Sequence, residues 1–322
     1  MKSHPATTTS ATPVLAERLT DWSSMAQGAF SGNTLRAWKA DWTVFTESCR
    51  VYRLESLPAA PKTVRAFVFE CLGKGKKPAT VRRYVSTIGR AHRASGVFDP
   101  TGSEDVKLAL REMGWNSTAR QKQARGLVWA EIEVFLSIEP RNLRDIRDRA
   151  LVAVAYDTMC RREELVSLRI EDIEEVADGS GAMLIRRSKT DTAGEGAMAY
   201  LSPLTIRLVA AWLKASQSKE GPLFVRVIGS KAGGFALTAQ VVAGVLQKVG
   251  QWIGLERVEW EKLSGHSARA GAAQDLLALN IHMASVMQAG RWKDTRMPMR
   301  YGEKVLASRG GMARAAKAQG RA

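Results

Sequence analysis

A break in the hydrophobic pattern near the middle of the chain limits the folds that this sequence can adopt. Residues 116–126 (NSTARQKQARG) are polar and basic, and they show neither helical nor strand periodicity. Regular apolar spacing occurs on both sides, and a chain of 322 residues that is 45% hydrophobic can bury a separate core in each part. We therefore predict a linker at 116–126 between domains at 31–115 and 127–322. Residues 1–30, rich in Thr, Ser and Ala, are predicted to form a flexible arm.

The first domain is predicted to be entirely helical. Apolar side chains recur at spacings of three and four residues from Leu35 to Cys49, as expected for one face of a helix. Pro61 suits the first turn of a second helix, and Ser95-Gly96 suits the end of a third helix at 79–94. A fourth helix is expected at 105–113.

The second domain is predicted to combine helices with two short strands. A strongly apolar helix is expected at 145–159, and two strands are expected at 183–186 and 197–200, around a polar connection. Further helices are predicted at 129–138, 204–215, 238–253, 267–279, 281–289 and 294–301. The predicted fold class is therefore mostly α, with a small β-sheet in the C-terminal domain.

The basic charge of the chain indicates a polyanionic partner. Its 48 Lys and Arg residues outnumber 32 acidic residues, which gives a net charge of +16 and a pI near 10.1. A merely basic, solvated surface would give the same totals. However, residues 62–93 hold nine basic side chains and one acidic side chain, interleaved with apolar residues at helical spacing, which indicates folded helices with a basic face. The predicted contacts with the polyanion are Lys74, Lys76, Lys77, Arg82, Arg83, Arg90, Arg120, Lys122 and Arg125.

The cysteine and histidine patterns argue against a metal site or a disulfide framework. Three cysteines are scattered without a CxxC motif, and the four histidines are too far apart for a helical metal motif. This cysteine usage is typical of a reducing cytoplasm. The N-terminus lacks the apolar run of a signal peptide, and no uncharged stretch is long enough to span a membrane. We expect no metal, no cofactor and no membrane partner.

Two pairs of polar residues have spacings that suit catalysis. His266 and Arg269 lie three residues apart among Gly and Ala, so a helix would place both on one face and allow a phosphate to approach closely. Arg161 and Glu164 have the same spacing and follow the apolar helix at 145–159. Taken alone, the first pair would be a buried His beside a surface Arg, and the second would be a weak surface ion pair.

Three further residues become catalytic candidates when they are considered together with these pairs. Lys189 lies in the polar connection between the predicted strands, where a lysine usually serves solubility. Trp292 and Tyr301 would ordinarily be packing residues, but an indole N–H can donate to a phosphate oxygen and a Tyr hydroxyl can act as a nucleophile. DNA strand transfer requires a nucleophile, cations for the non-bridging oxygens and an acid for the leaving 5′ oxygen. The seven residues supply these groups without metal or nucleotide.

The order and spacing of these residues resemble the tyrosine recombinase (phage integrase) family. The resemblance rests on TMCRREEL at 158–165, RSKT at 187–190, SGHSAR at 264–269, and MQAGRW at 287–292 followed by Arg300-Tyr301. It is strong over 127–303 and weaker over 30–115, which would be the family's core-binding domain. The family's seven active-site positions all hold the expected residue type here: Arg161, Glu164, Lys189, His266, Arg269, Trp292 and Tyr301.

The resemblance implies a specific reaction on double-stranded DNA. The two domains would form a C-shaped clamp around the duplex. Tyr301 would attack the scissile phosphate and produce a 3′-phosphotyrosine with a free 5′ hydroxyl, while Arg161 and Arg269 stabilise the pentavalent phosphate. A 5′ hydroxyl from a partner strand would then reverse the step. The phosphotyrosine would conserve the bond energy, so that neither ATP nor a metal is required.

The resemblance also implies supporting roles and an assembly. His266 and Trp292 would donate hydrogen bonds, and His266 would also accept the tyrosine proton. Lys189 would protonate the leaving oxygen, and Glu164 would orient the cluster. Four protomers on two inverted-repeat sites would form a Holliday junction, in the cytoplasm at the nucleoid. The target sequence and the biological role do not follow from the residues.

Two alternatives share part of this pattern. A type IB topoisomerase uses the same tyrosine chemistry but relaxes supercoils as a single protomer, and a non-catalytic protein would only bind DNA. The intact set of active-site residues argues against the second alternative. The tail departs from some members of the family, because alanines stand after Met312 where leucines of a docking helix are expected. Docking of the tail onto a neighbouring protomer is therefore expected to be weaker, or to use Val305 and Leu306.

Overall fold

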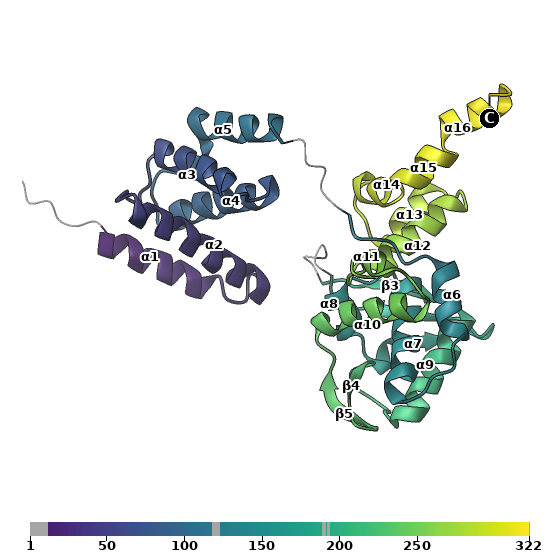
Figure 1. Ribbon diagram of the computed structural model, residues 1–322. Helices are drawn as coiled ribbons and strands as arrows, with labels where there is room; N and C mark the ends of the chain where they lie inside the picture. The colour runs from purple at the N-terminus through teal and green to yellow at the C-terminus, as the bar shows by residue number, and fades with distance from the viewer. Residues whose placement is uncertain (1–11, 118–122, 189–190, 192–193, 322) are drawn as a thin grey trace, which may run out of the picture. The chain divides into compact units, whose positions relative to one another are not determined.

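The chain forms two units, each with a hydrophobic core of its own. Figure 1 shows the helices and strands of both units. The computed structural model describes residues 12–117, 123–188, 191 and 194–321. The chain splits into one unit at 1–121 and another at 122–322, and this division lies within the segment predicted as a linker. The described elements are mostly helices, with short strands only in the second unit, in agreement with the predicted fold class.

The elements that the structure describes in the first unit are all helices. The last four α-helices of the unit lie close to the predicted positions, and the Ser31 hydroxyl caps the first of these four by accepting the backbone N–H of Thr34 at 3.2 Å. A 3₁₀ turn at Pro100–Gly102 precedes the last helix. The helices are α1 (Thr12–Met25), α2 (Gly32–Val51), α3 (Pro61–Gly73), α4 (Pro78–Ala94) and α5 (Glu104–Trp115).

Aromatic side chains from three helices form the centre of the first core. The rings of Phe45 on α2 and Phe67 on α3 lie 5.1 Å apart, and Tyr84 on α4 lies 5.9 Å from Phe67. His92 is also fully buried. Its Nε2 accepts the backbone N–H of Ala59 at 2.8 Å, and its Nδ1 lies 2.8 Å from the Ile88 carbonyl. His92 is therefore a core residue, and burial lowers its pKa.

The prediction of a flexible arm over 1–30 is wrong for the part of it that the structure describes. Helix α1 occupies Thr12–Met25 and turns Leu15, Leu19, Trp22 and Ala26 toward the unit. The Trp22 ring lies 5.7 Å from the ring of Trp38 on α2. Spacings of four, three and four residues make one apolar face, which the Thr, Ser and Ala content of this segment conceals. Residues 1–11 lie outside the described part of the chain.

The second unit places helices around two small antiparallel sheets. Its first elements are α6 (Trp129–Ser137), α7 (Leu143–Asp157), α8 (Arg162–Ser167), a 3₁₀ turn at Ile170–Asp172, β1 (Ile173–Glu175), β2 (Gly181–Ile185), β3 (Ala197–Leu201) and α9 (Pro203–Ser216). They are followed by β4 (Val225–Ile228), β5 (Lys231–Ala236), α10 (Ala239–Trp252), α11 (Arg257–Trp260), α12 (Ser267–Ala278), α13 (Met283–Gly290), α14 (Arg296–Tyr301), α15 (Glu303–Arg309) and α16 (Gly311–Ala318). None of the described helices has the length and apolarity that crossing a lipid bilayer requires.

The strands of the second unit exceed the two that were predicted. One sheet has the order β1-β2-β3, with Ile185 opposite Ala197 and Gly181 opposite both Glu175 and Leu201. The other sheet is the hairpin β4–β5. Strand β1 spans only three residues and β5 (KAGGFA) contains two glycines, so neither has a strong strand pattern in the sequence.

The second core surrounds a buried tryptophan between helices and sheet. Trp212 on α9 is fully buried, and its indole N–H donates to the Leu223 carbonyl at 2.8 Å. Helix α7 packs along α9, as Figure 1 shows. This packing anchors the C-terminal end of α7, which leads directly into the predicted active site.

The residues directly after the predicted linker are docked onto α12. The backbone N–H of Leu127 donates to the Ser267 carbonyl at 2.9 Å, and the N–H of Trp129 donates to Asp275 at 2.7 Å. Gly271 permits this contact, because a Cβ at that position would lie 1.8 Å from the Leu127 carbonyl oxygen. Residues 126–128 therefore belong to the second unit and brace the helix that carries His266 and Arg269.

Gly271→Ala is expected to destabilise the second unit by about 3 kcal/mol, because the clash is with backbone and cannot be relieved by a side-chain rotation. Gly244→Ala on the exposed face of α10 is the matched control, since an added Cβ there has no neighbour within 4 Å among the described residues. The control is expected to be more stable by about 0.5–1 kcal/mol. Denaturant unfolding of both variants measures the difference, and equal stabilities would contradict the docking described here.

Candidate active site

The predicted active site is built around the turn between α7 and α8. Helix α7 ends at Asp157, and the hydroxyl of the capping residue Thr158 donates to the Val154 carbonyl at 2.6 Å. Met159 then takes a left-handed conformation with φ of 50°, and the chain re-enters a helix after Arg161. A non-glycine residue in this conformation carries strain, which is common where a loop is shaped by a functional site. The turn presents the Thr158 and Met159 carbonyls to the arginines described below.

Glu164 holds Arg161 in place through two contacts. One carboxylate oxygen accepts from the Arg161 guanidinium at 2.6 Å, and the other accepts the Arg161 backbone N–H at 3.0 Å. The side chain of Glu164 is 4% exposed and that of Arg161 is 20% exposed, so the pair is not the routine surface ion pair of the alternative interpretation. Burial tends to raise the pKa of Glu164, but the hydrogen bonds and positive charges of its arginine partners outweigh burial and lower the pKa. Glu164 is therefore a buried carboxylate.

Arg269 lies on α12 beneath the same turn. Its guanidinium donates to the Met159 carbonyl at 2.6 Å and to the Gly290 carbonyl at 2.5 Å. Only 3% of the residue is exposed, and burial, together with the charge of Arg161, lowers its pKa to about 10. It therefore stays protonated at neutral pH. Two of its five N–H groups are used by these carbonyls, which leaves donors available for an anion.

Trp292 connects Arg269 to Tyr301. The Arg269 guanidinium lies 4.4 Å from the centre of the Trp292 ring, and the Tyr301 ring lies 6.0 Å from that of Trp292. Gly290 allows the indole to fold back, because a Cβ on Gly290 would lie 2.0 Å from the ring. Helix α14 ends at Tyr301, and both aromatic residues pack on a small cluster that includes Met159. The nucleophile candidate therefore lies close to a buried arginine.

His266 occupies the position before the first residue of α12 and is exposed. Partial desolvation of its ring lowers its pKa, and the charges of Arg269 and Arg162 act in the same direction. A lowered pKa keeps the imidazole neutral at neutral pH, which is the form that can accept a proton. The predicted i,i+3 relation holds for His266 and Arg269, although His266 is the cap of the helix and Arg269 lies inside it.

The structure thus brings most of the predicted catalytic residues to one place. Glu164 contacts Arg161 directly, and Arg269 contacts Trp292, which neighbours Tyr301. The seventh residue, Lys189, lies outside the described residues.

Arg291 is a member of this cluster to which the sequence analysis gave no role. Its guanidinium donates to Glu164 at 3.0 Å, to the Thr158 carbonyl at 2.8 Å and to the Met159 carbonyl at 3.3 Å. The residue stands in the motif Gly290-Arg291-Trp292, directly after α13. A possible signal was the presence of Arg just after a helix end, where glycine is the usual residue.

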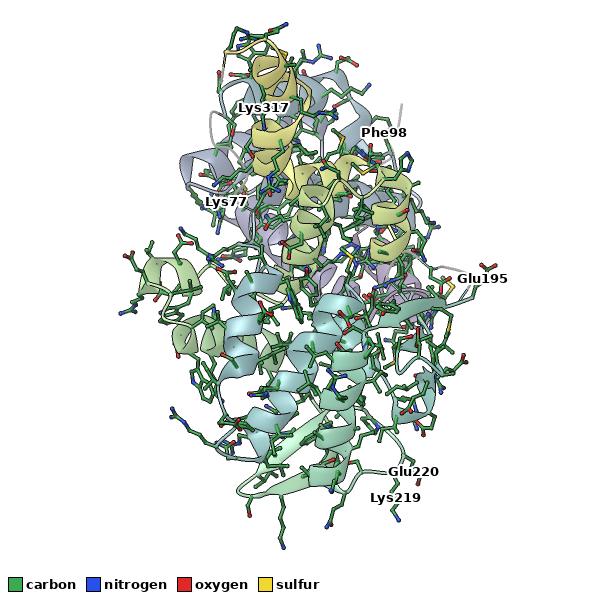
Figure 2. All side chains as sticks on the ribbon, turned by 90° about the vertical axis from the view of Figure 1, so that its right-hand side faces the viewer. Lys77, Phe98, Glu195, Lys219, Glu220 and Lys317 are labelled. Carbon is green, nitrogen blue, oxygen red and sulfur yellow. The ribbon has the colours of Figure 1, made fainter. Side chains whose placement is uncertain are left out.

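Several predicted polyanion contacts are exposed cations on the first unit. Lys76, Lys77 and Arg82 are exposed, and Lys77 points away from the ribbon in Figure 2. Lys74 pairs with Glu70 at 2.5 Å, and Arg83 pairs with the buried Asp41 at 2.7 Å while its own side chain stays 55% exposed. These residues lie in the turn between α3 and α4 and on the exposed side of α4, so they can bind an anion together.

Two predicted contacts are occupied by protein groups instead. The Arg90 guanidinium lies over the Trp38 ring at 4.2 Å and is partly buried. Arg125 forms ion pairs with Glu131 at 2.6 Å and with Glu259 at 2.8 Å. Both cations therefore stabilise their own units, and we assign neither to a partner. Arg120 and Lys122 lie outside the described residues.

The cysteines and other metal-binding side chains form no cluster in the part of the chain that is described. The three cysteines are buried and unpaired, and burial raises the pKa of Cys160 to about 11. Within the same residues, no three His, Cys, Asp or Glu side chains lie close enough together to hold a metal ion. The polar groups of the site are thus mainly arginine donors, which suit an anionic substrate.

Comparison with known proteins identifies the family to which this site belongs. The phage integrase family matches residues 127–305. The chain is 27% identical over 305 residues to the recombinase Cre of Escherichia phage P1, covering 89% of this chain and 88% of Cre.

Two solved structures share the fold. One is the Tn1549 transposon integrase with circular intermediate DNA (TM-score 0.63, 13% identity, 88% of this chain and 94% of the integrase). The other is the XerH recombinase bound to palindromic difH substrate (TM-score 0.58, 22% identity, 78% of this chain and 72% of XerH). The chain therefore belongs to the phage integrase family and is a tyrosine-type site-specific DNA recombinase.

Proposed function

We propose that Tyr301 is the nucleophile with which this recombinase cleaves and rejoins DNA. The observation that carries the proposal is the continuous contact from Tyr301 through Trp292 to the buried Arg269, beside the Glu164–Arg161 pair. A hydroxyl next to two arginines that are held by the protein suits attack on a phosphodiester. Tyr301 Oη forms a bond to phosphorus, the bond from phosphorus to the 5′ oxygen breaks, and a 3′-phosphotyrosine results.

The two arginines act on the charge of the phosphate. Arg161 is held by Glu164 through a single guanidinium nitrogen, and its other N–H groups have no acceptor within the described residues. Arg269 also keeps donors that its two carbonyl partners do not use. Because both guanidinium groups are positioned before the reaction, they can stabilise the pentavalent phosphate without a large reorganisation. Trp292 contributes its indole N–H and keeps Arg269 and Tyr301 together.

Proton transfer completes the step. The neutral imidazole of His266 takes the proton of the Tyr301 hydroxyl as the new bond forms. Lys189, which follows β2 in the sequence, gives a proton to the departing 5′ oxygen. The reverse step uses a 5′ hydroxyl from a partner strand, so the reaction needs neither ATP nor a metal.

The DNA substrate and the assembly are also part of this proposal. The exposed cations of the turn between α3 and α4 and of α4 bind the phosphates of the duplex. XerH was solved on a palindromic substrate, and we propose that this protein likewise binds inverted repeats, as four protomers on two sites that proceed through a Holliday junction. Helix α16 projects from the second unit in Figure 1, and its Met312 is 75% exposed, which suits a contact between protomers. The protein would act in the cytoplasm, at the nucleoid.

A nicked suicide duplex tests the proposed chemistry. Loss of a short 5′-hydroxyl fragment after cleavage prevents religation, so the wild-type protein should accumulate a covalent DNA adduct that is linked to Tyr301 in peptide mapping. The absence of an adduct on a duplex that is bound would contradict the proposal. Sedimentation on DNA with one site or two sites then separates a recombinase, which pairs its sites, from a topoisomerase-like protein, which acts alone.

DNA binding is expected to depend steeply on salt and cleavage is expected to be independent of divalent metal. Each phosphate contact releases counterions, so the logarithm of the affinity should fall by about 0.9 per contact for each tenfold rise in salt. Affinity for the cognate duplex, measured from low to moderate salt, gives this slope. An affinity that does not change with salt would contradict the basic contact surface. Loss of cleavage on addition of EDTA, restored by excess magnesium, would contradict the proposed chemistry.

The rate of cleavage is expected to resist a fall in pH to about 6.5, the ordinary pKa of histidine. The pKa of His266 is lowered, so the imidazole stays neutral and able to accept a proton down to a pH below that value. Single-turnover rates between pH 5 and pH 8 measure the acid limb, and His266→Gln should remove this limb along with most of the rate. An acid limb above pH 6.5 in the wild type would contradict the assignment of His266 as the base.

A further inference from the structure

Arg291 is buried at high cost to the fold. It has a left-handed conformation with φ of 54°, although glycine takes this conformation far more easily. Its side chain is only 10% exposed, and its buried Nε has no hydrogen-bond partner within the described residues. A strained backbone and an unsatisfied buried donor are both destabilising. A residue that is placed here only for stability would not be expected to carry both costs.

The contacts of Arg291 are concentrated on the residues that hold Arg161. Its Nη2 lies 3.0 Å from Glu164 Oε2, which is also the oxygen that accepts the backbone N–H of Arg161. Its Nη1 and Nη2 also donate to the carbonyls of Thr158 and Met159, the turn that precedes Arg161. Arg291 thus clamps both the carboxylate and the backbone on which Arg161 depends.

The other charged groups near Glu164 cannot replace this clamp. Arg161 donates to Oε1 through Nη1, and within the described residues no other guanidinium nitrogen of Arg161 donates to this carboxylate. Arg269 donates to the carbonyls of Met159 and Gly290, and within the described residues it makes no hydrogen bond to Glu164. His266 is exposed and lies at the start of α12, and Cys160 is a buried thiol 3.9 Å from Arg291. Without Arg291, the Oε2 atom of Glu164 would keep only one backbone donor.

We propose that Arg291 is a positioning residue for the strand-transfer reaction, which holds Glu164 and the 158–161 turn so that Arg161 is aimed at the scissile phosphate. This inference rests on the role proposed above for Arg161. Arg291 itself does not touch the substrate, because its Nη donors are taken by protein acceptors. Its removal should therefore leave DNA binding intact and impair the neutralisation of the phosphate.

A substrate with less phosphate charge separates this role from a general structural one. In a methylphosphonate, a methyl group replaces one non-bridging oxygen, so the scissile linkage is neutral and needs less help from an arginine. Arg161→Ala should therefore lose much more rate on the ordinary phosphodiester than on the methylphosphonate. If Arg291 acts through Arg161, Arg291→Gly should show the same selective rescue, which a loss of overall structure would not produce.

The experiment compares single-turnover cleavage of the two substrates at saturating protein. Arg291→Gly should cleave the phosphodiester about tenfold more slowly, the order expected from loss of a charge-assisted hydrogen bond. It should lose less than about threefold on the methylphosphonate and bind DNA within about twofold of the wild type. The double variant with Arg161→Ala should be no slower than Arg161→Ala alone, because two residues in one chain of contacts do not act additively.

The matched variants keep the result interpretable. Glycine relieves the left-handed strain, and thermal unfolding monitors whether the variant is folded; Arg291→Lys and Arg291→Gln provide the same comparison if it is not. Lysine keeps the charge without the guanidinium fork, so Arg291→Lys should fall between the wild type and Arg291→Gln. Arg257→Gln removes an exposed cation of the same unit, whose side chain is 82% exposed, and should change neither substrate.

Each possible result identifies which statement fails. If the wild type forms no adduct with the phosphodiester, the proposed function fails. If Arg161→Ala shows no selective rescue, the role of Arg161 fails, and the inference fails with it. If Arg161→Ala is rescued as expected but Arg291→Gly loses the same factor on both substrates, or adds its full loss to that of Arg161→Ala, only the role of Arg291 is overturned.

Discussion

Tyr301→Phe is expected to eliminate the covalent DNA adduct while leaving the affinity for the duplex within about twofold of the wild type. The substitution removes one hydroxyl and keeps the ring that packs against Trp292, so the local structure should persist. The proposed phosphate contacts, on which DNA affinity should mainly depend, lie on other residues, so loss of this oxygen should change the affinity little. Gel analysis of a nicked suicide duplex measures the adduct, and fluorescence anisotropy on an intact duplex measures binding.

Tyr200→Phe is the matched control for this prediction. Tyr200 lies on β3 and is 61% exposed, so the same loss of a hydroxyl should leave both cleavage and binding unchanged. An adduct formed by Tyr301→Phe would mean that another residue attacks the phosphate. A loss of DNA binding in that variant would instead mean that the Tyr301 hydroxyl has a structural role.

Lys189→Ala is expected to slow cleavage of an ordinary phosphodiester by at least about a hundredfold, but to slow a substrate with a bridging 5′ sulfur far less. Sulfur is a good leaving group and needs no proton from a general acid. Arg269→Ala should slow both substrates by about a thousandfold, because its donors act on the non-bridging oxygens. Single-turnover rates on the two substrates, with each of the two variants, complete the comparison.

The two variants control for each other, because each removes one positive charge. A simple loss of charge would slow both substrates equally in both variants. Arg269 is also bonded to the Met159 and Gly290 carbonyls, so its variant must be checked for folding, and Arg269→Lys offers a milder change at the same position. If sulfur does not rescue Lys189→Ala, Lys189 is not the acid and the proton donor must be another group.

Much of the fold could be predicted from the sequence, because a helix leaves a regular spacing of apolar residues over a short stretch of chain. The apolar repeat from Leu35 to Cys49 predicted α2, and the proline at Pro61 marked the start of α3. Strands β2 and β3 were also found, because each is a short apolar segment bounded by polar residues. Composition failed for α1, whose apolar face is visible only when Leu15, Leu19 and Trp22 are read at helical spacing.

The seven catalytic candidates could likewise be proposed from spacing and residue type. Their order along the chain was sufficient to indicate the family, because the combination of a His-x-x-Arg motif, an Arg-x-x-Glu motif and a later Tyr is rare by chance. The sequence was less informative about which basic residues are available to bind a partner. Arg90 and Arg125 carry the same charge as Lys77, yet Arg90 lies over Trp38 and Arg125 pairs with Glu131 and Glu259. Trp38 and Glu259 are far from their arginine partners in the sequence.

Long-range packing supplied what no sequence window contains. Glu164 is a buried carboxylate rather than a surface one, and Arg291, which directly follows α13 and lies more than a hundred residues later in the chain, forms an ion pair with it. The same packing places the Met159 carbonyl between two guanidinium groups and brings Tyr301 near Arg269. Residue type and spacing determined which groups could carry out the chemistry. Burial and long-range contact decided which of them are held, which are covered, and that Arg291 belongs among them.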